Sequence, residues 1–312
     1  MSVAQNNCLQ ELEENLIRYL EKETSAIDFD KRKKSIQDVF NTLDEAEATI
    51  MERYIRINQE NGISVSFMAE SYFFFLSEND KEEMYFYRNG QYRYSKLDEV
   101  INQVYNDENY MKRYMAGVAV SLLLWPQHRS YLHFYRHFMK TYKRDQGLYL
   151  EVGAGHGIYC SEALKQGLFS RYDVVDISET SLTLTKKMTA EFFDTHEIRF
   201  IHADFLQFES DERYDVISIS EVLEHVETPQ DFLDKSRKLM KDDGRLYLTT
   251  CINAPEIDHI YLFRTIQEVE DLFASAGLGI DEKLYVPYKN TTIERSERQK
   301  LPINVAYILK KI

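Results

Sequence analysis

The sequence has little of what marks secreted or membrane-spanning proteins. Its three cysteines, at positions 8, 160 and 251, follow no regular spacing, which argues against a disulfide framework and favours a reducing compartment. Its longest apolar run, residues 116–125, is too short for a membrane span, which needs about 20 residues. The first residues lack a basic segment followed by an apolar core, so we predict no signal peptide. These absences favour a soluble, cytoplasmic protein without a membrane partner.

Positive charge is also scarce. Lys and Arg number 38 against 52 Asp and Glu, a formal net charge of −14, so long-range repulsion works against a nucleic-acid partner. Apolar residues, in contrast, are plentiful: 44% of the 312 residues are hydrophobic and 13% are aromatic. That is enough to bury the core of one large or two modest domains. We expect a small-molecule substrate, and leave open whether the protein forms a homodimer.

Chain breakers are few before residue 146, where most of the glycines begin. The spacing of apolar residues predicts helices over residues 9–20, 34–58 and 107–143. Pro126 is expected to break the last of these. Asn89-Gly90, a type I′ turn signal between alternating aromatic residues, predicts a hairpin over 83–95. Residues 1–145 therefore read as a mainly helical domain.

After residue 146 strands and helices alternate. Strands are predicted over 148–152, 171–176, 198–202, 215–220, 245–251, 280–286 and 304–309. Helices are predicted over 157–165, 181–193, 228–240 and 266–276. For 228–240, Thr228 is expected to be the N-cap and Pro229 the first helical residue. This alternation indicates an α/β domain over 146–312, with a mostly parallel sheet that binds ligands at the carboxyl ends of its strands.

Three glycines follow the first predicted strand. Gly153, Gly155 and Gly157 let the chain turn sharply and let a ligand lie against bare backbone, next to the start of a helix. On its own, this pattern fits a tight turn as well as a ligand site. The next two predicted strands end in Asp176 and Asp204. An acid at the first position can bind both ribose hydroxyls of a nucleoside, and one at the second can reach an adenine amino group.

Together these residues resemble class I S-adenosylmethionine-dependent methyltransferases. The segment 151–157, Glu-Val-Gly-Ala-Gly-His-Gly, matches the first motif of that family, and the final segment resembles its antiparallel last strand. A dinucleotide-binding dehydrogenase would instead have Gly-x-Gly-x-x-Gly. The resemblance implies a Rossmann-like, seven-stranded mixed sheet. It also implies donor contacts from Glu151, Gly153, Gly155, Gly157, Asp176, Ile177, Asp204, Phe205 and Ser220.

A second pattern lies in the stretch Ser-Glu-Val-Leu-Glu-His-Val-Glu-Thr-Pro, residues 220–229. On a helix, Glu221, Glu224 and His225 would share one face. That arrangement fits either part of a metal site or a charged helix start. The same Glu-x-x-Glu-His resembles a motif of the ubiquinone-biosynthesis O-methyltransferases and of the small-RNA 2′-O-methyltransferases. In the second group, this motif binds a divalent metal together with a later histidine.

Here the later histidine is His259. The resemblance therefore implies a metal bound by Glu221, Glu224, His225 and His259. Two carboxylates and two imidazoles suit Mn²⁺, Fe²⁺, Co²⁺ or Zn²⁺ better than Mg²⁺. The alternative without metal is equally concrete. The glutamates would then interact with a helix dipole, and His225 and His259 would serve as catalytic bases or packed residues.

Substrate contacts are expected from the aromatic segment 125–138 and from Tyr261. We name Tyr131, His128 and Tyr135 as candidates, beside the alternative that they only pack in the core. The expected function is methyl transfer from S-adenosylmethionine to a small molecule, first of all to oxygen. The alternatives are N-methylation without a metal and a non-catalytic protein that binds the donor. RNA methylation is disfavoured by the acidic charge.

Overall fold

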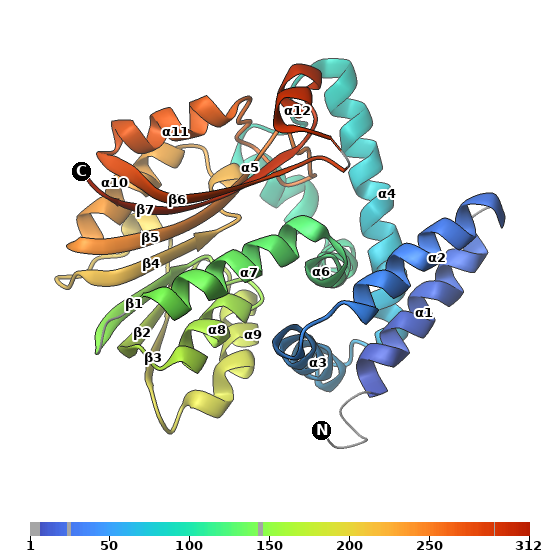
Figure 1. Cartoon of the computed structure of the whole chain (residues 1–312), viewed down its shortest axis with the longest axis horizontal. Helices are drawn as coiled ribbons and strands as arrows, with labels where there is room; N and C mark the ends of the chain where they lie inside the picture. Colours follow the sequence, from blue (N-terminus) through green and yellow to red (C-terminus); the bar gives the residue numbers. More distant parts are fainter. Residues whose placement is uncertain (1–6, 24–25, 143–145, 290) are drawn as a thin grey trace. The chain divides into compact units, whose positions relative to one another are not determined.

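The computed structural model describes residues 7–23, 26–142, 146–289 and 291–312, which form two compact units (Figure 1). One unit runs to Lys81 and resumes over Asn102–Arg129; the other comprises Glu82–Ile101 and Ser130–Ile312. Segments 82–101 and 130–142, expected in the amino-terminal domain, are thus counted with the sheet unit. The expected boundary, at residue 145, falls on a segment outside the described residues.

The first unit is helical and has an aromatic core of its own. Its helices are α1 (Asn7–Glu23), α2 (Ala26–Asn41), α3 (Glu45–Glu60), the first part of α4 (Val65–Asn89) and α6 (Glu108–Leu124). Helices α4 and α6 cross so closely that a Cβ on Gly117 would lie 2.4 Å from the Ser71 carbonyl oxygen. Phe75 packs against Tyr114 and Trp125, each with ring centroids 5.3 Å apart. Helix α7 (Pro126–Thr141) follows, which confirms the helix break at Pro126.

The single helix expected over 34–58 is wrong, because the chain breaks between α2 and α3. The cause is a capping box. Asp44 Oδ1 accepts a hydrogen bond from the Glu47 backbone N–H at 2.7 Å, and Glu47 Oε2 accepts one from the Asp44 backbone N–H at 2.9 Å. These reciprocal bonds satisfy two donors at the helix start and thus begin a new helix.

The hairpin expected over 83–95 is also wrong. Helix α4 continues to Asn89, and Gly90 follows it with φ +68°. The Gly90 N–H donates to the Phe86 carbonyl oxygen at 2.7 Å, as at a helix end with a left-handed residue after it. A glycine supplies positive φ to a hairpin turn and to a helix end alike, so the Asn-Gly pair did not decide between the two.

The second unit contains a seven-stranded mixed sheet. Its strands are β1 (Gly147–Val152), β2 (Phe169–Asp176), β3 (Glu197–His202), β4 (Tyr214–Ser220), β5 (Met240–Ile252), β6 (Leu278–Pro287) and β7 (Ile303–Lys311). They lie in the order β3-β2-β1-β4-β5-β7-β6. The pairs among β1 to β5 are parallel, whereas β7 is antiparallel to both β5 and β6. This confirms the expected Rossmann-like fold with an antiparallel last strand.

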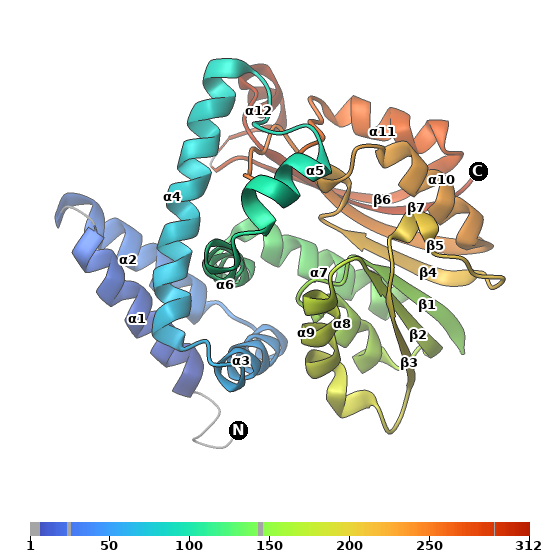
Figure 2. The ribbon, with the colours of Figure 1, turned by 180° about the vertical axis from the view of Figure 1, so that it is seen from behind.

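Helices cover both faces of this sheet (Figures 1 and 2). On β1, Leu150 belongs to the core beneath α10 (Pro229–Leu239) and α11 (Ile266–Ser275), and Tyr149 to the core beneath α7 and α8 (Ile158–Gln166). Strands β1 and β4 are buried almost along their whole length, as expected for strands covered on both sides. Their carboxyl ends therefore remain as the place for polar residues.

The remaining elements are short. They are α5 (Leu97–Val100), the π-helical η1 (Ile101–Tyr105), α9 (Glu179–Thr189), α12 (Ile293–Gln299) and the 3₁₀ turns η2 (Ala190–Phe192), η3 (Phe205–Gln207) and η4 (Leu223–His225). Thr228 is the N-cap residue of α10 with Pro229 next, as expected, but its side chain makes no capping hydrogen bond among the described residues. No helix within the described ranges combines the length and apolarity that crossing a membrane requires.

Candidate functional site

The three glycines after β1 differ in what surrounds them. All have positive φ, at +72°, +49° and +72° for Gly153, Gly155 and Gly157. A Cβ on Gly153 would lie 2.6 Å from Val222 Cγ2, and one on Gly157 would lie 2.8 Å from Thr185 Cα. A Cβ on Gly155 would have nothing within 4 Å. The outer glycines are therefore needed for close packing, whereas Gly155 leaves bare backbone facing open space.

Asp176 lies beside this bare backbone, at the end of β2. Its Oδ2 accepts a hydrogen bond from the Gly155 N–H at 3.2 Å, and its Oδ1 accepts one from the Ser178 N–H at 2.8 Å. Burial raises the pKa of this carboxyl, and the backbone donors around it, including Gly155 and Ser178, act in the opposite direction. The next side chain, Ile177, is 62% exposed. A carboxylate and an exposed apolar side chain thus lie together at the glycine loop.

Asp204 and Phe205 follow β3 in different environments. Asp204 Oδ1 accepts from the Leu206 N–H at 2.9 Å, which caps the short turn η3. The Phe205 side chain is buried, with its ring 5.3 Å from that of Phe232. Asp204 lies near the end of β2, because the N–H of its neighbour Ala203 donates to the Asp176 carbonyl oxygen at 3.1 Å. Phe205 contributes a packed core side chain.

Glu151 lies under the glycine loop and is almost fully buried. Tyr149 donates its hydroxyl to Glu151 Oε2 at 2.7 Å, and the Tyr135 hydroxyl lies 2.8 Å from that of Tyr149. Burial raises the pKa of Glu151 to about 8, against the opposing effect of the Tyr149 hydrogen bond. A cationic ligand group would favour the ionised form of this carboxyl.

The stretch after β4 does not form the expected α-helix. Glu221 has φ +52°, and Leu223–His225 form the 3₁₀ turn η4. Helix α10 starts only at Pro229, because the residue before a proline disfavours helical geometry. Glu221, Glu224 and His225 therefore share no α-helical face. The turn is instead tied to the loop after β5: the Glu224 carbonyl oxygen accepts from the N–H groups of Ile260 and Tyr261, at 2.9 and 3.0 Å.

Two carboxylates on this turn carry one unsatisfied oxygen each. Glu224 is fully buried, and its Oε2 accepts the Thr250 hydroxyl at 2.7 Å. Glu221 is half-buried, and its backbone N–H donates to Thr249 Oγ1 at 3.0 Å. Within the described residues, Oε1 of Glu221 and Oε1 of Glu224 have no hydrogen-bond partner. Burial raises the pKa of both carboxyls, and the charge of Glu221 raises that of Glu224 further.

His225 and His259 meet edge to face, with ring centroids 4.8 Å apart. His259 Nδ1 lies 2.7 Å from the Ala254 carbonyl oxygen, and His225 Nδ1 lies 3.1 Å from the Asp258 carbonyl oxygen. Because a carbonyl can only accept, each Nδ1 carries the proton and each Nε2 keeps a lone pair. Burial lowers the pKa of His259 to about 3, and His225 lowers it further. The lowered pKa keeps the His259 ring neutral, with an Nε2 lone pair that can bind a metal ion.

The predicted metal ligands are distributed over two overlapping groups. Glu224, Cys251 and His259 place ligand atoms within 4.8 Å of one another, and so do His225, Asp258 and His259. Glu221 belongs to neither group. Neither Asp258, which directly precedes His259, nor Cys251 was predicted as a ligand.

The predicted substrate residues lie in varied surroundings. The Tyr131 hydroxyl is fully buried and donates to the Thr250 carbonyl oxygen at 3.1 Å. Tyr135 is equally buried, and its hydroxyl is hydrogen-bonded to that of Tyr149. Tyr261 is half-buried, with its ring centroid 4.7 Å from that of Phe263. His128 belongs to the helical unit, where it stacks on Trp125 and burial lowers its pKa to about 4. Substrate contact by these four residues stays a prediction.

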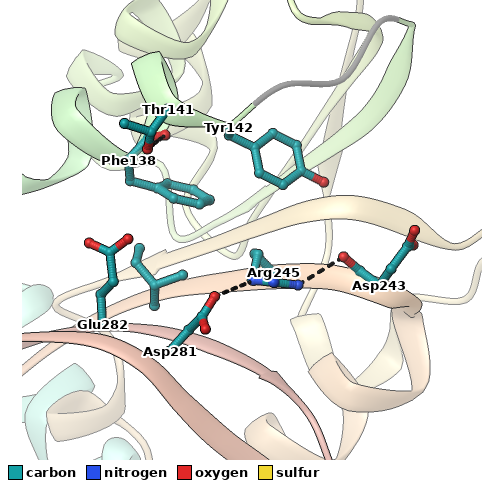
Figure 3. Close-up of a pocket in the computed structure, with 8 residues that line it drawn as sticks. Phe138, Thr141, Tyr142, Asp243, Arg245, Asp281 and Glu282 are labelled. Atoms are coloured by element: carbon teal, nitrogen blue, oxygen red, sulfur yellow. Dashed lines mark hydrogen bonds and ion pairs between the residues drawn. The ribbon is translucent and has the colours of Figure 1, made fainter.

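A cavity of about 310 Å³ lies away from all of these residues (Figure 3). It is lined by Phe138, Thr141, Tyr142, Asp243, Arg245, Asp281, Glu282 and Ile308. Arg245 donates to Asp281 Oδ2 at 2.8 Å and to the Asp243 carbonyl oxygen at 2.9 Å. Its β5 residues come from the start of that strand, whereas the glycine loop and the turn η4 follow strand ends. None of the residues predicted for function lines this cavity.

Comparisons with known proteins agree with this geometry. A family model described as a methyltransferase domain matches residues 126–282, just over half of the 312 residues. The chain is similar to the ubiquinone biosynthesis O-methyltransferase of Leptothrix cholodnii, with 32% identity over 108 residues, which are 34% of this chain and 45% of that protein. It is also similar to the mitochondrial ubiquinone biosynthesis O-methyltransferase of Schizosaccharomyces pombe, with 31% identity over 102 residues, 32% of this chain and 36% of that protein.

The chain thus spans less than half the length of these two curated relatives. Among solved structures, the mitomycin 7-O-methyltransferase MmcR is similar with a TM-score of 0.51 at 12% sequence identity. This match covers 80% of the present chain and 70% of that one, and at so low an identity it is a likeness of fold alone.

Proposed function

The chain belongs to the methyltransferase domain family, and we propose that it transfers a methyl group from S-adenosylmethionine to an oxygen atom of a small molecule. One observation carries this proposal. The bare backbone of Gly155 faces open space and is hydrogen-bonded to the Asp176 carboxylate. A flat, hydroxyl-bearing ligand can lie against such backbone and present its hydroxyls to the acid.

The residues around the loop fit the chemistry of this donor. Asp176 would hold the ribose hydroxyls, and the exposed Ile177 would cover one face of the adenine, with Asp204 at its amino group. Glu151 would face the cationic methionine part, which favours the ionised form of that carboxyl. When bound, the donor supplies an electrophilic methyl carbon on a sulfonium centre.

On the acceptor side, His225 would act as general base. Its Nδ1 is held by the Asp258 carbonyl oxygen, so Nε2 can take the proton of the acceptor hydroxyl. The freed oxygen lone pair then forms the bond to the methyl carbon while the carbon–sulfur bond breaks and leaves a neutral thioether. The O-methyltransferase names of the curated relatives favour oxygen over nitrogen as the acceptor atom.

The same residues fit a divalent metal. Oε1 of Glu221 and Oε1 of Glu224 are buried without a partner among the described residues, and Nε2 of His259 keeps its lone pair. We propose that these two glutamates, His225 and His259 hold the ion when it is bound, and that Nε2 of His225 is then a ligand and not the general base. A bound ion would lower the pKa of an acceptor hydroxyl. Carboxylates with imidazoles favour Mn²⁺, Fe²⁺, Co²⁺ or Zn²⁺ over Mg²⁺.

Donor binding tests the core of this proposal. Isothermal titration with S-adenosylhomocysteine should show one site per chain, and NAD should show none. Asp176→Asn should weaken that site, whereas Asp242→Asn, at an exposed surface position, should not. A wild-type protein that binds neither S-adenosylmethionine nor S-adenosylhomocysteine would end the proposal.

The acceptor class and the metal need a separate experiment. Wild-type protein is incubated with radiolabelled donor and a panel of catechols, phenols and primary amines, before and after chelation. We expect label in the catechols or phenols, lost on chelation and restored by Mn²⁺ or Co²⁺. Label only in amines would overturn the choice of oxygen, and transfer that survives complete chelation would overturn the metal.

A further inference from the structure

A segment outside the family match attaches to the acceptor side of the site. Residues 90–97, which we call the strap, follow α4 and lead into α5. The family model covers residues 126–282, so the strap belongs to the part of the chain before that match. It is nevertheless counted in the same compact unit as the sheet. The strap is thus an addition of this chain to its sheet unit.

Three hydrogen bonds fasten the strap to the two segments that carry the predicted acceptor residues. The Arg264 guanidinium donates to the Gly90 carbonyl oxygen at 3.3 Å, and the Ala254 N–H donates to the Tyr92 hydroxyl oxygen at 3.1 Å. The Leu97 N–H donates to Glu227 Oε1 at 3.1 Å. The first two bonds reach the loop that carries His259, and the third reaches the turn that carries Glu224 and His225.

Tyr92 is the central contact of the three. Its side chain is 5% exposed, and its ring lies 5.8 Å from the rings of both Phe86 and His259, measured between centroids. Ala254 connects Tyr92 to His259: its N–H donates to the Tyr92 hydroxyl, and its carbonyl oxygen accepts from His259 Nδ1 at 2.7 Å. One residue of the loop is therefore held by the tyrosine and in turn holds the histidine.

We propose that Tyr92 is a positioning residue that fixes the orientation and tautomer of His259 through Ala254. With Nδ1–H committed to the Ala254 carbonyl, Nε2 keeps the lone pair that a proton or a metal ion needs. The ring of Tyr92 serves packing on Phe86, which a phenylalanine would serve equally. The hydroxyl has one described contact, the Ala254 N–H. The link from Tyr92 through Ala254 to His259 rests on geometry alone. Its consequence, an Nε2 of His259 that is available to a proton or a metal ion, rests on the proposed function.

Tyr92→Phe isolates the hydroxyl, and Tyr87→Phe is its matched control, because Tyr87 lies near the end of α4, just before the strap, and is 55% exposed. Protein labelled with ¹⁵N-histidine gives the tautomer of His259 from long-range ¹H–¹⁵N spectra, with His259→Gln for assignment. We expect the Nδ1–H tautomer in the wild type and in Tyr87→Phe. In Tyr92→Phe we expect a shift towards a mixture of tautomers.

Co²⁺ titration of the same proteins supplies a second readout. Tyr92→Phe should bind Co²⁺ about tenfold or more weakly, as for the loss of a group that orients a metal ligand, with affinity for S-adenosylhomocysteine unchanged. A wild-type His259 spectrum together with wild-type Co²⁺ affinity in Tyr92→Phe would overturn the inference. If the wild type binds neither S-adenosylhomocysteine nor Co²⁺, the proposed function fails, while the His259 spectrum still decides the role of Tyr92.

Discussion

The donor side and the acceptor side of the site are built in different ways. The donor side comprises residues 151–157, 176–177 and 204–205, and both oxygens of its Asp176 accept backbone N–H bonds. The acceptor side comprises residues 221–225, 251–264 and Tyr92. Its glutamates keep unsatisfied oxygens, and both Glu221 and Asn253 have positive φ. Strain and unsatisfied groups that persist in a fold are concentrated where function uses them.

The two sides differ in which residues determine their chemistry. The donor contacts lie at strand ends that the parallel sheet brings together, and backbone N–H groups hold the Asp176 carboxylate there. An acceptor side formed by side chains depends on contacts between distant segments, as between Tyr92 and Ala254, which are 162 residues apart. Substitutions should therefore separate the two sides, with donor binding lost on one and turnover on the other.

The largest effect should come from Glu224→Gln. The variant keeps the shape of a fully buried side chain but replaces a proposed carboxylate ligand by an amide, so turnover should fall at least about 100-fold, beyond the roughly 10- to 100-fold that the loss of an outer partner of a metal ligand costs. Affinity for S-adenosylhomocysteine should stay within twofold. Glu209→Gln, whose side chain is 92% exposed, is the control. Equal losses of donor binding and turnover in Glu224→Gln would show that the two sides are not separate.

Asp176→Asn should have the opposite pattern. Each charge-assisted hydrogen bond from the carboxylate to the ribose is worth about 1.5–3 kcal/mol, so donor affinity should weaken about 10- to 150-fold. Turnover at saturating donor should change far less. Titration calorimetry and saturation kinetics measure the two quantities. Unchanged donor affinity would place the ribose elsewhere.

Glu151, on the donor side, should make the unfolding free energy depend on pH. Burial raises its pKa from 4.5 to about 8 in the folded protein, so the native state keeps a proton that the unfolded chain loses. Its contribution to stability is full below pH 4.5 and is lost as pH rises to about 8. Across that window the unfolding free energy of the wild type should fall relative to Glu151→Gln by about 1.4 kcal/mol per pH unit. Denaturant titrations at several pH values measure this, and parallel curves would contradict it.

The smallest effects should distinguish the glycines. Gly155→Ala should cost about 1–2 kcal/mol of stability through its positive φ, and should weaken donor binding because the methyl group enters open space. Gly157→Ala carries the same strain and adds a 2.8 Å approach to Thr185 Cα, so its melting temperature should fall further. Gly62→Ala, also at positive φ with nothing within 4 Å, is the control for strain. Equal donor affinity in Gly62→Ala and Gly155→Ala would refute binding of the donor against the Gly155 backbone.

The sheet and the donor side followed from local sequence patterns. Runs of apolar residues predicted the strands, and because a parallel sheet brings strand ends together, the glycine loop and Asp176 lie within hydrogen-bond distance in the structure. Local signals also failed where they were ambiguous. Asn89-Gly90 ends a helix instead of turning a hairpin, and Asp44 with Glu47 starts a helix inside a stretch whose periodicity appeared continuous.

The acceptor side was predictable only in part. Glu224, His225 and His259 were found from a motif, and two of them meet with ring centroids 4.8 Å apart. Tyr92, Asp258 and Thr250 were not identified for this site, since their roles arise from pairing between separate loops that no periodicity encodes. Residues 221–225, for which a helix start was one of two open alternatives, instead contain a residue with positive φ, Glu221, and a 3₁₀ turn over Leu223–His225.

The most direct test of the donor site is a crystal structure of the protein with S-adenosylhomocysteine. The account predicts the nucleoside against Gly155, with the ribose hydroxyls on Asp176 and the adenine beside Ile177. A structure with the ligand bound elsewhere, or with a dinucleotide in its place, would contradict it.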